Sequence, residues 1–61
     1  MDFTMKVNLD NAAFGGITGE DELLRILDIV KNKVDIIGLA KGYSLNLRDI
    51  NGNTVGSFKI K

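Results

Sequence analysis

The sequence predicts a small α+β domain in which one helix packs against one face of a three-stranded sheet, in the order strand, helix, strand, strand. Three observations predict it: an alternating apolar segment at residues 3–9, an amphipathic segment at residues 19–34, and an Asn-Gly pair at residues 51–52 between two further alternating segments. Periods of two and of about 3.6 residues are typical of half-buried strands and helices. At 61 residues, the chain forms one βαββ domain, residues 1–61.

The first alternating segment, residues 3–9, predicts a half-buried strand. One of its faces carries the apolar residues Phe3, Met5, Val7 and Leu9. Asp10 and Asn11 end the strand, and a glycine-rich connection follows at residues 12–19. We expect Phe14 and Ile17 to tether this connection beneath the start of the helix, whereas an exposed Phe14 would indicate a contact site.

A helix is predicted over residues 19–34. Thr18 is placed to cap its N-terminus, and the acidic residues 20–22 lie where the helix dipole favours negative charge. The predicted buried stripe, widened by Leu24, consists of Leu23, Leu27, Val30 and Val34. Ile26 and Ile29 fall outside the stripe and make the apolar face wider than a small sheet covers. No proline marks the end of the helix, which leaves a later end open.

The Asn51-Gly52 pair predicts a two-residue type I′ turn, because Asn and Gly tolerate positive φ at both central positions. A hairpin closed there pairs Ile50 with Asn53 and Arg48 with Val55. Followed outward, the same register pairs Leu47 with Gly56, Leu45 with Phe58, and Tyr43 with Ile60. A slip of one residue would separate the members of each apolar pair onto opposite faces. Turn chemistry and apolar pattern therefore select the same register.

The third strand completes a split βαβ sheet. The crossing helix leaves the first and second strands parallel, so the third strand is antiparallel to both and lies between them. The helix is expected to cover the face that carries Phe3, Met5, Val7, Leu45, Leu47, Phe58 and Ile60. Gly56 falls on the same face, where its missing side chain would let the helix approach the central strand.

The composition argues against catalysis and against a bound cofactor or metal. The chain has no cysteine and no histidine, so thiolate ligands, imidazole ligands and a histidine-activated nucleophile are all absent. The glycines form no phosphate-binding loop, and the carboxylates at residues 20–22 diverge around the helix. Asp49, Asn51 and Asn53 resemble the start of a calcium loop, but Gly52 is misplaced and no closing Glu follows. We therefore expect a non-enzymatic protein without a cofactor.

Nucleic-acid binding is the second hypothesis for this chain. Eight basic and eight acidic residues give zero net charge, which disfavours a strongly basic binder and an acidic mimic alike. In the predicted register, however, Lys6, Arg48 and Lys59 share the open face of the sheet. The aromatic residues Phe3, Tyr43 and Phe58 fall on the other face, so the open face offers a base no ring to stack on.

Protein binding is the leading hypothesis, with another protein or a second copy of this chain as the partner. The outer strands of the predicted sheet carry unpaired backbone groups that can pair with another strand. The predicted contact residues are Phe14, Ile26, Ile29, Ile36 and Ile37, each of which fits the core equally well. No apolar run has the length of a membrane span, and the N-terminus lacks the pattern of a signal peptide, so we expect a cytoplasmic protein.

Two motifs resemble small uncharacterised proteins encoded by bacteriophages and prophages. One is Asp10-Asn11-Ala12-Ala13-Phe14, and the other is the Arg-Asp-x-Asn-Gly-Asn-x-Val-Gly pattern within residues 47–58. In the similar proteins a strand ends in the first motif, an amphipathic helix follows, and the second motif forms the final hairpin. Residues 34–42 are more apolar here. The resemblance implies a phage gene product that acts in a bacterial cytoplasm by occupying a host protein, including components of antiviral defence. It carries over no activity.

Overall fold

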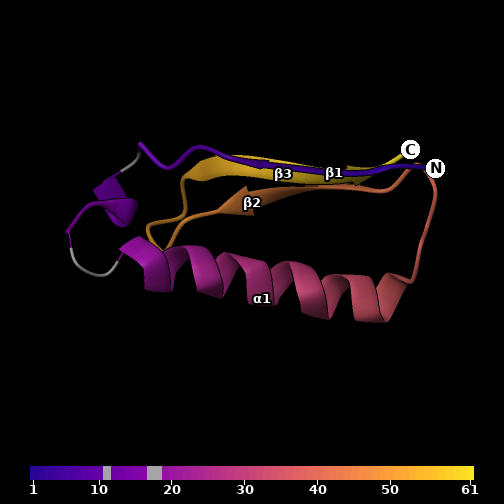
Figure 1. The fold of residues 1–61 in the computed structure, drawn as a ribbon, viewed down its shortest axis with the longest axis horizontal. Helices are drawn as coiled ribbons and strands as arrows, with labels where there is room; N and C mark the ends of the chain where they lie inside the picture. Colours follow the sequence, from indigo (N-terminus) through magenta and orange to yellow (C-terminus); the bar gives the residue numbers. More distant parts are fainter. Residues whose placement is uncertain (11, 17–18) are drawn as a thin grey trace.

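The computed structural model describes residues 1–10, 12–16 and 19–61. Its elements are a strand β1 (Phe3–Val7), a short 3-10 helix η1 (Ala12–Phe14), a helix α1 (Gly19–Ile37), and two strands, β2 (Ser44–Arg48) and β3 (Thr54–Ile60). The strands form one sheet in the order β1-β3-β2, and β3 is antiparallel to both neighbours. α1 runs along one face of this sheet (Figure 1). The predicted α+β class, the element order and the central place of the last strand are confirmed.

α1 continues three residues beyond its predicted end, to Ile37. Gly38 adopts a φ of 67°, and its N–H donates to the Val34 carbonyl at 2.8 Å. This is the left-handed helix termination that glycine favours, so the apolar run through Ile36 and Ile37 belongs to the helix. The predicted cap Thr18, the predicted tether Ile17 and the strand-ending Asn11 lie outside the described residues.

The hairpin has the predicted register but a different turn. Pairing from Ser44 with Lys59 to Leu47 with Gly56 is confirmed, whereas Arg48 pairs with Thr54 rather than with Val55. The Asp49 N–H donates to the Asn53 carbonyl at 2.8 Å and closes a loop over residues 50–52. Gly52 has a φ of 86°, and no described non-glycine residue has a positive φ. The predicted type I′ turn is therefore wrong, and a three-residue loop with a left-handed glycine takes its place.

The altered turn places a β-bulge at Val55. Because Val55 is the extra residue of β3, the strict alternation of its strand is broken, and its side chain is buried with the core. Gly56 follows the bulge. A Cβ there would lie 2.9 Å from the Val7 Cα and would overlap the Lys6 carbonyl. The close neighbour of Gly56 is thus the backbone of β1 and not the helix, which corrects the prediction.

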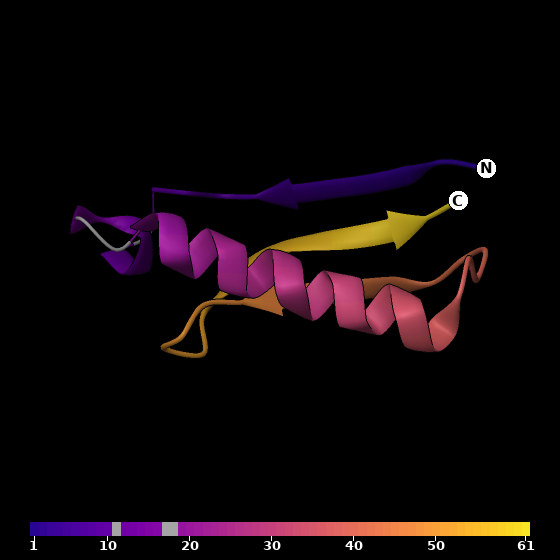
Figure 2. The same cartoon turned by 60° about the horizontal axis from the view of Figure 1, so that its bottom comes forward.

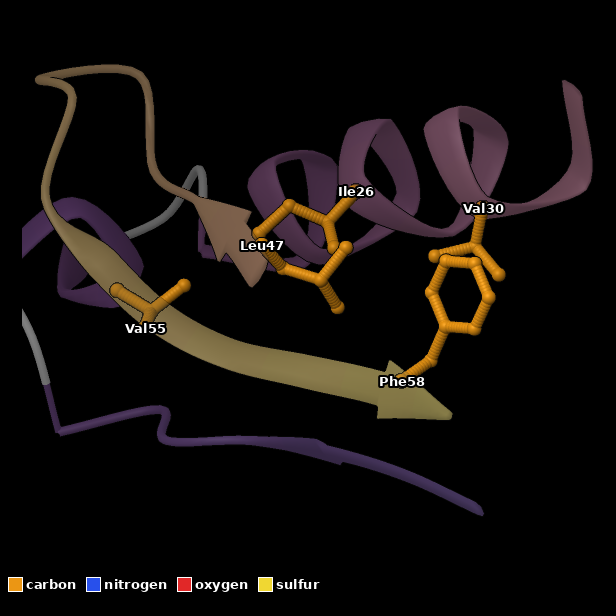
Figure 3. Close-up of a cluster of buried hydrophobic side chains, with 5 residues drawn as sticks. All are labelled: Ile26, Val30, Leu47, Val55 and Phe58. Atoms are coloured by element: carbon orange, nitrogen blue, oxygen red, sulfur yellow. The ribbon is translucent and has the colours of Figure 1, made fainter. Parts of the chain in front are cut away.

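The core lies between α1 and the β2–β3 hairpin. Ile26 and Val30 of α1 face Leu47, Val55 and Phe58 (Figure 3). The rings of Phe3 and Tyr43 flank the Phe58 ring with centroid separations of 5.5 and 5.9 Å, so the three aromatic residues share the covered face as predicted.

The helix is rotated relative to the predicted stripe. Ile26 is 1% exposed, whereas Leu27 is 42% exposed and Leu24 is more exposed still. The line that faces the sheet is Glu22, Ile26 and Val30, at spacings of four residues, which successive turns of a helix bring onto one side. Leu23 and Val34 are half-buried beside this line. The predicted stripe is therefore right at Val30 and wrong at Leu27.

α1 covers the sheet unevenly. In Figure 2 the helix overlies β2 and the side of β3 next to it, while β1 lies to one side of the helix. Phe58, at the centre of the sheet, is fully buried, but Phe3 on β1 is 51% exposed although it belongs to the same face. The uneven cover leaves apolar surface open on both flanks of α1.

Candidate protein-interaction surface

A buried carboxylate anchors the start of α1 to the hairpin loop. Glu22 is buried, and its Oε2 accepts the N–H of Ile50 at 2.9 Å. Its Oε1 accepts a hydrogen bond from Arg25 Nε and forms an ion pair with it. The Arg25 bond and the Ile50 N–H hold the pKa of Glu22 below its ordinary value, although burial opposes this. Glu22 therefore fixes the rotation of α1 about its axis. An exposed acidic residue at the helix N-terminus would not do so.

A second buried carboxylate, Asp49, shapes the loop itself. Its Oδ1 accepts the N–H groups of Asn51 and Asn53 at 2.9 and 2.8 Å, and its Oδ2 accepts the Asn53 side-chain amide at 3.3 Å. Burial by itself raises the pKa of Asp49, but these hydrogen bonds outweigh it and lower the pKa overall. The prediction that turn chemistry accounts for Asp49, Asn51 and Asn53 agrees with these bonds.

The anchored loop and the helix together form what we call the α1–β2 surface: Arg25, Ile29, Ile36, Arg48 and Ile50. An open hollow of about 320 Å³ lies within it, and its lining includes all of these residues except Ile36. Ile36 is 78% exposed two helical turns beyond Ile29, and Ile50 is 73% exposed at the loop. Large apolar side chains thus stand in solvent on one flank of α1.

Two guanidinium groups border the hollow. Arg25 Nη2 donates to the Arg48 carbonyl at 3.2 Å, and Arg48 Nη1 donates to the Gly52 carbonyl at 3.2 Å. The carboxylate in the lining, Asp49, is buried and already accepts loop N–H groups. The surface is therefore apolar with a basic rim, and each arginine still has donor groups that no described bond uses.

The five predicted contact residues do not form one group. Ile29 and Ile36 share the α1–β2 surface and are exposed. Ile26 is a core residue, which corrects its place among the candidate contacts: the helix rotation set by Glu22 turns it into the sheet. Phe14 is half-buried and packs against the core from η1, and Ile37 is half-buried at the end of α1. Of the five residues, Ile29 and Ile36 thus belong to the α1–β2 surface.

Sequence reasoning missed Ile50 and Arg25. The predicted two-residue turn makes Ile50 a strand residue, and the helical pattern puts Arg25 on the solvated polar side of the helix. A signal for Arg25 was present, because a Glu and an Arg three residues apart on the first helical turns are placed to pair. A signal for Ile50 was present as well, because an apolar residue within an Asp-x-Asn loop has no strand neighbour to cover it.

Two of the three basic residues of the alternative hypothesis, Lys6 and Lys59, lie on the open face of the sheet. Lys59 pairs with Thr4 and Ser44, and Lys6 pairs with Ser57, so the two lysines are neighbours on adjacent strands. Arg48 sits at the far end and is bonded to the loop. The rings of Phe3, Tyr43 and Phe58 lie on the covered face, so the described strands present polar side chains and no stacking platform on the open face.

No protein-family model, no curated protein and no solved structure matches the chain. Among the described residues, no cluster of His, Cys, Asp or Glu is arranged to hold a metal ion. A search of the same residues finds no helix with the length and apolarity needed to cross a membrane.

Proposed function

We propose that this chain is a non-enzymatic protein-interaction module that binds a host protein through the α1–β2 surface. The observation that carries the proposal is the exposure of Ile29, Ile36 and Ile50 beside two arginines, on a flank where Glu22 joins α1 to the hairpin loop. Apolar residues and Arg are the groups that contribute most to protein interfaces. The partner that fits is a protein surface with a protruding apolar side chain next to a carboxylate.

The biological setting of the proposal rests on the resemblance of the two sequence motifs to phage proteins. It suggests a phage gene product that acts in the bacterial cytoplasm and inhibits a host protein, such as a component of antiviral defence. Binding alone is sufficient for this role, because a small module can block a larger protein by covering one of its sites.

The experiment is a tagged pull-down from bacterial lysate, with and without nuclease, read by mass spectrometry. The test variant is Ile29→Asp/Ile36→Asp, in which the carboxylate introduced at position 29 lies one turn from Arg25 and from Lys33, so the helix tolerates the charge. The matched control is Leu24→Lys, which removes an exposed apolar residue from the other side of α1 and places a cation one turn from Glu20 and Asp28. Far-UV circular dichroism verifies that both variants fold.

We expect one host protein that survives nuclease, is retained by Leu24→Lys and is lost with Ile29→Asp/Ile36→Asp. Equal recovery with both variants would overturn the assignment of the α1–β2 surface. Recovery of nucleic-acid-associated proteins alone, lost on nuclease treatment and in Lys6→Glu/Lys59→Glu, would replace the proposal with the nucleic-acid hypothesis.

A further inference from the structure

The outer edge of β1 is an unpaired strand edge. Asp2 and Lys61 exchange backbone hydrogen bonds of 2.8 and 2.9 Å, and bonded and non-bonded pairs alternate along an antiparallel ladder. Thr4 and Lys6 therefore bond to β3 through their backbone groups. The N–H and C=O groups that point away from the sheet belong to Phe3, Met5 and Val7. Within the described residues no strand lies beyond β1.

The opposite edge of the sheet, at β2, is less open. Arg25 donates to the Arg48 carbonyl, and the bulge opposite Arg48 interrupts the regular pairing at that end. Bulges and covered carbonyls are devices that keep a strand edge from pairing with another chain. Within its described residues, β1 has neither a bulge nor a covered carbonyl. Lys6 is its charged side chain.

The flank beside β1 is apolar and incompletely covered. Phe3 is half exposed, and Leu27 of α1 and Leu9 after β1 are exposed as well. The chain exposes 4373 Å² in total, whereas a globular monomer of 6.7 kDa is expected to expose about 3,900 Å². The excess of roughly 470 Å² belongs to the whole chain and not to this flank alone; taken over two copies, it approaches the total of about 1,000 Å² that a small specific interface buries.

The charges along β1 are self-complementary. On the open face, Asp2, Thr4 and Lys6 follow one another at every second residue. When two such strands pair antiparallel about Thr4, Asp2 of each copy lies opposite Lys6 of the other, and the two threonines meet at the axis. Opposite charges and Thr–Thr pairs are favourable across strands, whereas pairing about Lys6 would set the two lysines against each other.

We propose that β1 pairs antiparallel with β1 of a second copy, centred on Thr4, so that the two sheets join into one. In this register the outward N–H and C=O groups of Phe3 and Met5 bond across the two-fold axis. On the covered face, Phe3 of each copy packs beside Met5 of the other. Because α1 lies over β2 and β3 rather than over β1 (Figure 2), the two helices sit apart on the joined sheet.

Self-association by this edge is independent of the α1–β2 surface. The binding of a host protein and the self-association use opposite edges of the sheet and different residues, so each proposal can fail alone. A variant of the α1–β2 surface, Ile29→Asp/Ile36→Asp, is expected to dimerise as the unaltered chain does.

The test is sedimentation velocity of the purified chain from the low micromolar to the millimolar range, at low and high salt. We expect a monomer–dimer equilibrium that salt weakens. Lys6→Glu should weaken it about tenfold or more, because two attractive cross-strand pairs become repulsive, and the exchanged variant Asp2→Lys/Lys6→Glu should restore it. A chain that stays monomeric throughout this range would refute the proposal, as would a dimer that Lys6→Glu leaves unchanged.

Hydrogen exchange of the unaltered chain provides a test that needs no substitution. The amides of Phe3 and Met5 should exchange fast in dilute solution and become protected as the concentration rises. The amides of Thr4 and Lys6, which bond to β3, should be protected at both concentrations. Concentration-dependent protection in β2 instead of β1 would assign the interface to the other edge and overturn the proposal.

Discussion

Shortening Ile26 by one methyl group tests which side of α1 faces the sheet. Ile26 is 1% exposed and belongs to the core cluster. Ile→Ala at such a site costs about 2–5 kcal/mol and Ile→Val about 0.5–1.5 kcal/mol. A chain of 61 residues is expected to have a total stability of about 3–9 kcal/mol. Ile26→Ala would remove much of that, so Ile26→Val is the variant with a measurable transition.

The assay is urea unfolding followed by circular dichroism at one fixed protein concentration, because any self-association adds to the apparent stability. With a urea dependence of about 1 kcal/mol per molar for so small a chain, Ile26→Val should lower the midpoint by roughly 0.5–1.5 M. The matched control is Ile29→Val, at an exposed site three residues away, which should change the free energy of unfolding by less than about 0.5 kcal/mol. Both changes keep a β-branched residue, so helix propensity cancels. Equal losses at the two positions would refute the rotation of α1.

Two further predictions concern the hairpin. Gly56→Ala should prevent β1 from pairing with β3, because the added Cβ would overlap the Lys6 carbonyl; amide spectra should lose the β1 cross-strand contacts, and a native spectrum would contradict the close approach. Stability should fall on acidification, because the pKa values of Glu22 and Asp49 are lowered in the folded chain. The stabilisation from these two carboxylates is fully present above their unfolded pKa values of about 4, and it is lost as the pH falls through their folded pKa values. Urea midpoints measured against pH should show this decline, and Glu22→Gln/Asp49→Asn should flatten it; an unchanged slope in that variant would assign the decline to other groups.

The features that residue type alone determines were predictable from the sequence. Alternation of apolar residues predicted a strand at residues 3–9, of which β1 covers Phe3–Val7. The pairing of Leu45 with Phe58 was predicted because a slip of one residue would move apolar side chains from the core to water. Ile29 was predicted to exceed what the sheet covers, and it is exposed. Ile36, which was placed at the exit of the helix and counted among the contacts, is exposed as well. These predictions need no knowledge of any particular polar contact.

The features that depend on one polar contact were not predictable in the same way. The loop over residues 50–52 follows from the Asp49 carboxylate, which collects N–H groups from both sides of the turn, and the bulge at Val55 follows from that loop. The rotation of α1 follows from Glu22, whose bond to Ile50 joins segments far apart in the chain. Residue propensities treat both acids as ordinary turn and cap residues. The sequence pattern therefore placed Ile26 outside the stripe that faces the sheet.

The central place of β3 also determines the order in which the fold can assemble during synthesis. β1 and β2 pair with β3 and not with each other, and β3 is the last of the three to be made. The β2–β3 hairpin closes over a short loop, whereas β1 must wait for a partner about fifty residues later in the chain, and such distant pairings form slowly. Until then Phe3, Met5 and Val7 remain unpaired, and an apolar strand in that condition is prone to aggregate. Of the three strands, β1 is thus made first and is among the last segments to be protected.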